Sequence, residues 1–149
     1  MVDSDLPVFF EHQRDPKATR MAGFGPRDRD AFMSHWKNRV LGDEAVLART
    51  VVADGEVAGN VVSFVSPLAP RREVGYWIGR DFWGRGVATA ALRQFLALER
   101  RRPLYAGVVT HNVGSIRVLE KCGFRVTDEE VAPPGSRDDG LEEVLLELV

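Results

Sequence analysis

The chain has 149 residues, a hydrophobic fraction of 44%, a charged fraction of 28% and a formal net charge of −2. This length suits one domain with a substantial core, so we expect a single domain over residues 1–149. The slightly acidic balance disfavours a nucleic-acid partner, and no apolar stretch is long enough for a membrane span. The acidic start carries no signal-peptide pattern, so a cytoplasmic protein is predicted. With one cysteine, Cys122, and three dispersed histidines, neither a disulfide nor a metal site is expected.

The N-terminal part is predicted to contain a strand followed by two helices. Leu6–Phe10 is a short apolar run with strand character. Asp15-Pro16 has the pattern of an N-cap followed by a first-turn proline, and it opens a short helix to about Ala22. Apolar residues spaced by three and four predict a second helix over residues 28–40.

The rest of the chain is predicted to form a mixed sheet. Strands at 45–53 and 57–66 flank Asp54-Gly55, a strong tight-turn signal. The later elements follow as a strand at 72–79, a helix at 88–98, a strand at 104–110, a short helix at 114–122 stopped by Gly123, and strands at 124–130 and 142–149 around a loop at 131–140. The strand–helix–strand unit between residues 72 and 110 implies a parallel pair with a right-handed crossover.

A glycine-containing loop connects the strand at 72–79 with the helix at 88–98. Gly84 and Gly86 allow the main chain to approach a ligand closely and to adopt conformations that a side chain would forbid. Free backbone N–H groups at the start of the helix, together with the positive end of its dipole, suit an anion. The loop therefore predicts a phosphate or pyrophosphate site.

Two common phosphate-binding motifs fit this loop poorly. A nucleotide P-loop places Gly-Lys-Ser/Thr at the helix start, which is missing here. A dinucleotide fingerprint has Gly or Ala three residues after Gly86, where this chain has Thr89. The acetyl-CoA loop of the GNAT superfamily, Gln/Arg-x-x-Gly-x-Gly/Ala, is a closer match. The segment that resembles it, with Trp83 replacing the first polar residue, is Trp83-Gly84-Arg85-Gly86-Val87-Ala88.

A second segment resembles one branch of that superfamily, the ribosomal-protein N-terminal acetyltransferases. That branch carries an Asn-x-x-Ser…Glu-Lys-x-Gly-Phe signature, and its counterpart here begins at Asn112 and ends at Phe124. The resemblance covers about residues 45–149 well and the first 40 residues in outline. It implies an α/β (α+β) fold of the GNAT type. That fold has a mixed, mostly antiparallel sheet of six to seven strands, a central parallel pair splayed around CoA, and helices on both faces.

The resemblance also implies an activity and a set of cofactor contacts. An acetyl group would pass from acetyl-CoA directly to a primary amine, of a small molecule or a peptide N-terminus, in a ternary complex. Backbone groups of Trp77, Ile78 and Gly79 would hold the pantetheine arm and polarise the thioester carbonyl, and Asn112 would bond the pantetheine. The N–H groups from Gly84 to Thr89 would hold the pyrophosphate, with Trp83 at the cofactor mouth. Arg85 either adds a charged contact to phosphate or stays a solvated loop cation.

An acceptor amine must lose a proton before it attacks, because a lysine amine has a pKa of about 10.4. Glu73 is the first candidate for the base, since it begins the strand that would hold the pantetheine. The alternative for Glu73 is a rim carboxylate paired with Arg71 or Arg72. Glu11 is the reserve candidate, in the region that borders the acceptor site in this family.

The leaving thiolate needs a proton donor. Many GNAT enzymes use a tyrosine at the position held here by Leu119, so that acid is missing. The ribosomal-protein branch assigns the role to a serine that maps onto Ser115, which could also serve as an N-cap or first-turn residue of the short helix. Cys122 is expected in the core rather than as an acyl carrier.

Other functions stay open at this point. A non-catalytic acyl-CoA-binding sensor or regulatory module would keep the loop and lose the chemistry, and the missing tyrosine favours it slightly. A dinucleotide-binding oxidoreductase is disfavoured by Thr89. The identity of the acceptor depends on residues 11–25 and 131–140, which carry no readable motif. A homodimer is the default expectation for a symmetric assembly.

Overall fold

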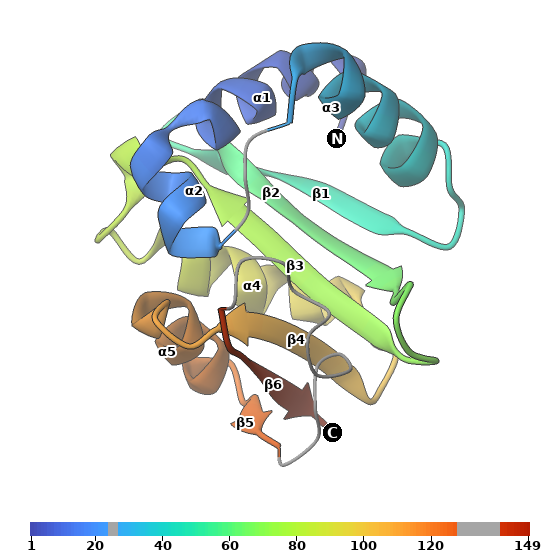
Figure 1. Cartoon of the computed structure of the whole chain (residues 1–149), viewed down its shortest axis with the longest axis vertical. Helices are drawn as coiled ribbons and strands as arrows, with labels where there is room; N and C mark the ends of the chain where they lie inside the picture. The colour runs from blue at the N-terminus through green and yellow to red at the C-terminus, as the bar shows by residue number, and fades with distance from the viewer. Residues whose placement is uncertain (24–26, 128–140) are drawn as a thin grey trace.

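A six-stranded mixed sheet organises the computed structural model of the protein, which describes residues 1–23, 27–127 and 141–149 (Figure 1). The order across the sheet is β1-β2-β3-β4-β6-β5. The strands are β1 (Leu47–Ala53), β2 (Glu56–Val65), β3 (Arg72–Ile78), β4 (Leu104–Val109), β5 (Arg125–Val126) and β6 (Glu143–Leu148). The pair β3–β4 is parallel and the other neighbouring pairs are antiparallel, which confirms the predicted mixed sheet.

The helices lie on both sides of this sheet. They are η1 (Asp3–Asp5), α1 (Leu6–Arg14), α2 (Pro16–Ala22), α3 (Arg29–His35), η2 (Trp36–Leu41), η3 (Arg80–Phe82), α4 (Val87–Leu98) and α5 (Val113–Lys121). Figure 1 shows α4 behind the strands, while α1 and α2 lie in front near the ends of β2 and β3. The predicted caps are present: the Asp15 carboxylate accepts from the backbone of Lys17 and Ala18 at the start of α2.

The predicted N-terminal strand at Leu6–Phe10 is wrong, because these residues begin α1. Leu6, Phe9 and Phe10 are separated by three and four residues, so a helix places them on one buried face. They pack against Phe32 of α3, and the Phe9 ring lies 5.3 Å from the ring of Trp36. A run of five apolar residues is too short for its period to separate strand from helix.

The hairpin and the C-terminal strands match their predictions to different degrees. Asp54 and Gly55 both have positive φ angles, of 52° and 77°, which confirms the tight turn between β1 and β2. The strand predicted at 124–130 is present as β5 over Arg125–Val126. Residues 128–130 and the predicted loop at 131–140 lie outside the described residues.

A buried carboxylate connects the sheet to the end of α4. The Glu99 side chain is 1% exposed, and its Oε2 accepts hydrogen bonds from Ser63 Oγ at 2.6 Å and Arg72 Nε at 3.2 Å. Its Oε1 accepts from Arg101 Nε at 2.9 Å. Burial by itself raises the pKa of Glu99, but hydrogen bonds from Arg101, Ser63 and Arg72 outweigh it and lower the pKa from 4.5 to about 2. The carboxylate is therefore charged and fully partnered in the folded protein.

The described part of the chain has neither a membrane-spanning helix nor a metal-binding cluster. No helix within residues 1–23, 27–127 and 141–149 is long and apolar enough to cross a membrane. The same residues contain no group of three or more His, Cys, Asp or Glu side chains that could hold a metal ion.

Candidate active site

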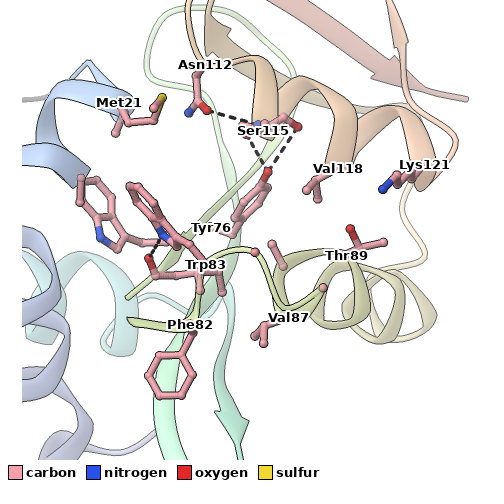
Figure 2. Close-up of a pocket in the computed structure, with 18 residues that line it drawn as sticks. Met21, Tyr76, Phe82, Trp83, Val87, Thr89, Asn112, Ser115, Val118 and Lys121 are labelled. Carbon is pink, nitrogen blue, oxygen red and sulfur yellow. Dashed lines mark hydrogen bonds between the residues drawn. The ribbon is translucent and has the colours of Figure 1, made fainter. Parts of the chain in front are cut away.

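A cavity of about 510 Å³ opens where β3 meets the glycine loop (Figure 2). Its walls come from α2, β3, the loop before α4, the first turn of α4, and α5. The lining residues are Ala18, Met21, Ala22, Tyr76, Trp77, Ile78, Phe82, Trp83, Gly84, Gly86, Val87, Ala88, Thr89, Asn112, Gly114, Ser115, Val118 and Lys121. Most of the cofactor contacts expected from the sequence therefore surround one cavity, although Gly79 and Arg85 are not among its lining residues.

The cavity lies beside a gap between the two parallel strands. Their pairing register is limited to Glu73 opposite Tyr105, at the start of β3. Toward its other end β3 stays paired with β2, where Gly79 N–H donates to Ala58 O at 2.8 Å. Hydrogen-bonded and non-hydrogen-bonded pairs alternate along an antiparallel ladder, so the backbone groups of Tyr76 and Ile78 face the gap. The Ile78 carbonyl accepts from Trp83 Nε1 at 2.8 Å, which leaves the Ile78 N–H as a donor on this side.

The glycine loop presents the start of α4 to this cavity. Gly84 and Gly86 have φ angles of 74° and 75°, in the left-handed region that favours glycine. Gly86 is the N-cap of α4, and no side chain caps the helix there. The first N–H groups of an α-helix have no partner within the helix, so those of Val87, Ala88 and Thr89 are available at the cavity wall. This geometry is that of an anion site.

Arg85 and Lys121 are basic residues near the loop, and the sequence predicted a phosphate contact only for Arg85. The Arg85 side chain pairs with the carboxylate of Asp54, and its guanidinium lies 5.4 Å from the centre of the Phe82 ring. Lys121, at the end of α5, lines the cavity with Thr89 and Val118. Figure 2 shows the Lys121 amine directed toward the cavity. In the sequence, Lys121 is part of the segment that resembles the Glu-Lys-x-Gly-Phe signature.

Polar side chains gather at the start of α5. Asn112 is the N-cap, and its Oδ1 accepts from Ser115 N–H at 3.2 Å, so its amide N–H₂ group remains as a donor. Ser115 Oγ lies 2.6 Å from the Tyr76 hydroxyl, which reaches across from β3 (Figure 2). Burial raises the pKa of Tyr76 to about 12, against a smaller lowering by the Ser115 hydrogen bond. Both hydroxyls are therefore neutral across the physiological range.

The segments on two sides of the cavity are connected directly. His111 Nε2 lies 2.8 Å from the carbonyl oxygen of Arg20, so the residues before α5 contact the end of α2. Leu119, at the position of the family tyrosine, is 1% exposed and packs in the main core instead of lining the cavity. Cys122 also lies outside the lining, with its Sγ 3.8 Å from Thr89 O, and burial raises the pKa of its thiol.

The two candidate carboxylates lie outside the cavity lining. Glu73 forms an ion pair with Arg71, with 3.5 Å between Oε2 and Nε, and its side chain is 13% exposed. It shares a face of β3 with Trp77, and Gly75 between them carries no side chain. Among the described residues, and apart from its chain neighbours, a Cβ atom added at Gly75 would meet Phe64 Cε1 alone, at 3.9 Å. Glu11 is exposed on α1 and pairs with Arg14 at 3.2 Å.

A protein-family model and two curated relatives match this chain. The model, described as an acetyltransferase (GNAT) domain, matches residues 1–125. YdaF of Bacillus subtilis (strain 168), provisionally named a ribosomal N-acetyltransferase, is 28% identical over 102 residues, which cover 64% of this chain and 55% of YdaF. YjcK of the same organism, provisionally named an N-acetyltransferase, is 41% identical over 56 residues, which cover 34% of this chain and 30% of YjcK. The chain thus spans about half the length, or less, of these relatives.

Solved structures share the fold at low sequence identity. Aminoglycoside acetyltransferase AAC(6')-Ib in complex with coenzyme A superposes with a TM-score of 0.79 at 19% identity, covering 100% of this chain and 91% of the other. Spermidine N-acetyltransferase from Vibrio cholerae, in complex with CoA and spermine, gives a TM-score of 0.79 at 15% identity, covering 99% and 91%. At these identities the likeness establishes the fold.

Proposed function

This chain belongs to the GNAT family of acetyltransferases, and we propose that it transfers the acetyl group of acetyl-CoA directly to a primary amine. The observation that carries the proposal is the continuity of the cavity. One wall is the uncapped start of α4, and another carries the hydroxyl and amide groups of Tyr76, Asn112 and Ser115. A long ligand with phosphates at one end and a reactive thioester at the other suits that arrangement.

The proposed cofactor placement follows from the donors around the cavity. The pyrophosphate would accept from the N–H groups between Gly84 and Thr89. The pantetheine arm would lie along β3, with its amides bonded by Asn112. The Ile78 N–H would donate to the thioester carbonyl, where negative charge develops as the amine attacks. Gly79 would contribute by fixing the end of β3, since its own N–H is bonded to Ala58.

Lys121 is the cation that we propose for the CoA phosphates, on the support of its place in the cavity lining. Lys121→Ala should weaken acetyl-CoA binding about fivefold, which corresponds to about 1 kcal/mol. The matched control is Arg85→Ala. The Arg85 side chain already pairs with Asp54, so its removal should weaken acetyl-CoA binding less. Calorimetric titration at low and high salt measures the acetyl-CoA affinity of both variants. The loss caused by Lys121→Ala should be smaller at high salt, because salt screens the attraction between the lysine and the phosphates. Equal losses for the two variants would contradict the assignment.

The proposed transfer keeps the acyl group on CoA until the amine attacks. The neutral amine nitrogen bonds to the thioester carbon, the carbon–sulfur bond breaks, and the sulfur leaves with the electron pair. The nitrogen loses one proton through water to give the amide, and the thiolate takes up one proton to give the CoA thiol. Ser115 is the proposed donor to that sulfur, supported by its hydroxyl at the cavity wall. Direct transfer is supported by Cys122, because a half-buried thiol with a raised pKa outside the cavity lining is a poor acyl carrier.

Glu73 remains the first proposed base, acting through water. Along β3 it lies roughly 13 Å before Trp77, and Gly75 leaves space on the shared face. We expect Glu73→Gln to lower kcat about a hundredfold and to leave acetyl-CoA affinity unchanged. The Glu11→Gln variant is the parallel measurement. Full activity in both variants would remove both carboxylates from the mechanism and leave deprotonation to solvent.

The acceptor class needs its own experiment. We propose a small-molecule amine or a peptide N-terminus, and the similarity to YdaF supports the ribosomal-protein branch only distantly. The panel should contain peptides with free N-termini, a polyamine and an aminoglycoside, each incubated with acetyl-CoA and examined by mass spectrometry. An acetylated product from at least one amine is the expected result. Acetyl-CoA binding without any acetylated amine would favour the sensor instead.

A further inference from the structure

Tyr76 has a position that no motif predicted. It lies on β3, its hydroxyl is 2.6 Å from Ser115 Oγ and 3.4 Å from Ser115 O, and both residues line the cavity. The two residues are separated by 39 positions in the chain, so the contact exists only because α5 folds beside the open end of β3. Figure 2 shows the Tyr76 ring extending from the strand toward the first turn of α5.

The direction of this hydrogen bond decides what Ser115 can do. A hydroxyl has one proton to donate and two lone pairs to accept with. If Ser115 donates to Tyr76, its proton is used and no donor remains for the sulfur. If Tyr76 donates to Ser115, the Ser115 proton is free to turn into the cavity. The Tyr76 hydroxyl can also donate to the Ser115 carbonyl oxygen at 3.4 Å, so Ser115 offers it two acceptors.

The chemistry of the tyrosine favours the second direction. A phenol is a stronger acid than an aliphatic alcohol and is the better donor of the two. Its pKa of about 12 also keeps the proton on Tyr76 near neutral pH. A serine oxygen that accepts one hydrogen bond becomes a better donor in the next, because hydrogen bonds in a chain polarise one another.

We propose that Tyr76 is a positioning residue that donates to Ser115 Oγ and thereby directs the Ser115 hydroxyl at the sulfur atom of the leaving CoA. This inference rests on the proposed function, in which Ser115 serves the sulfur. No additional proton is consumed: the sulfur leaves with the electron pair of the broken bond and accepts the Ser115 hydrogen bond, while Tyr76 keeps its proton. The tyrosine that is missing at Leu119 is thus replaced by a hydroxyl pair from two elements.

The test is a double-mutant cycle of Tyr76→Phe, Ser115→Ala and the combined variant, assayed with acetyl-CoA and a verified acceptor. Tyr76→Phe removes only the hydroxyl and should lower kcat about tenfold with acetyl-CoA affinity changed less than twofold. Ser115→Ala should lower kcat at least as much. The combined variant should equal Ser115→Ala alone, because Tyr76 acts through Ser115. If the Tyr76 hydroxyl had only a structural role, Tyr76→Phe would instead lower the melting temperature and leave kcat unchanged.

Tyr105→Phe is the matched control, since it makes the same chemical change at the other tyrosine of the chain, on β4 and outside the cavity lining. It should keep full kcat. Full activity of Tyr76→Phe, or losses that multiply in the combined variant, would overturn the inference while leaving the proposed function intact. Absence of turnover in the unmodified protein with every amine would overturn the proposed function itself.

Discussion

Gly86→Asp should weaken acetyl-CoA binding by at least about tenfold, or about 1.4 kcal/mol. The new carboxylate would lie at the N-cap of α4, where the backbone N–H groups and the helix dipole otherwise attract phosphate. Apart from its chain neighbours and the backbone of its own helix, a Cβ atom added at Gly86 meets no atom of residues 1–23, 27–127 and 141–149 within 4 Å, so packing within this part of the chain does not oppose the variant. The positive φ of 75° is a separate cost for any side chain at this position.

Gly86→Asn separates charge from backbone strain. Asparagine has nearly the shape of aspartate and tolerates the left-handed region, but it carries no charge. We expect its loss of acetyl-CoA affinity to be clearly smaller than that of Gly86→Asp when both folded variants are titrated calorimetrically. If Gly86→Asp bound acetyl-CoA as tightly as the unmodified protein, the phosphates would not lie at the start of α4. If both variants lost equal affinity, backbone strain rather than charge would be the cause.

Glu99→Gln should lower the free energy of unfolding by about 3 kcal/mol at neutral pH, because breaking a buried ion pair leaves an uncompensated charge. The Arg72 side chain is 11% exposed and would keep its charge beside an amide. Chemical denaturation measures the change. Glu44→Gln is the control, since it removes a carboxylate from an exposed position and should stay within about 0.5 kcal/mol.

The stabilities of the unmodified protein and of Glu99→Gln should depend differently on pH in the acidic range. The folded pKa of Glu99, about 2, lies below its ordinary value of 4.5, so its stabilising contribution is fully present above 4.5. That contribution is lost as pH falls from about 4.5 to about 2. The stability difference between the unmodified protein and Glu99→Gln should therefore shrink over this range. A difference independent of pH would mean that the charge of Glu99 contributes nothing.

Local patterns predicted most of the fold and most of the residues that line the cavity. The Asp54-Gly55 turn, the proline-opened α2 and the glycine loop before α4 each depend on neighbouring residues, and each is present. The strand prediction for Leu6–Phe10 was wrong because a run of five apolar residues suits a strand as well as a helix. Its helical form depends on the aromatic residues of α3 and η2, which lie far along the chain.

The remainder of the site depends on contacts between distant segments. No local pattern pairs Tyr76 with Ser115, because the two residues are 39 positions apart in the chain. The ion pair between Arg85 and Asp54 likewise joins residues that are 31 positions apart. Lys121 belonged to a matched motif, but its direction toward the cavity depends on how α5 packs against α4. Such juxtapositions follow from the sheet topology rather than from any window of sequence.

The most direct test of acetyl transfer is the initial rate of free-thiol release as acetyl-CoA and a primary amine are varied together. Direct transfer in a ternary complex predicts release that requires the amine and double-reciprocal lines that intersect. Parallel lines, with a burst of thiol in the absence of amine, would indicate an acyl-enzyme and contradict direct transfer. Tight acetyl-CoA binding with no amine-dependent release from any acceptor would contradict the enzyme and leave a binding module.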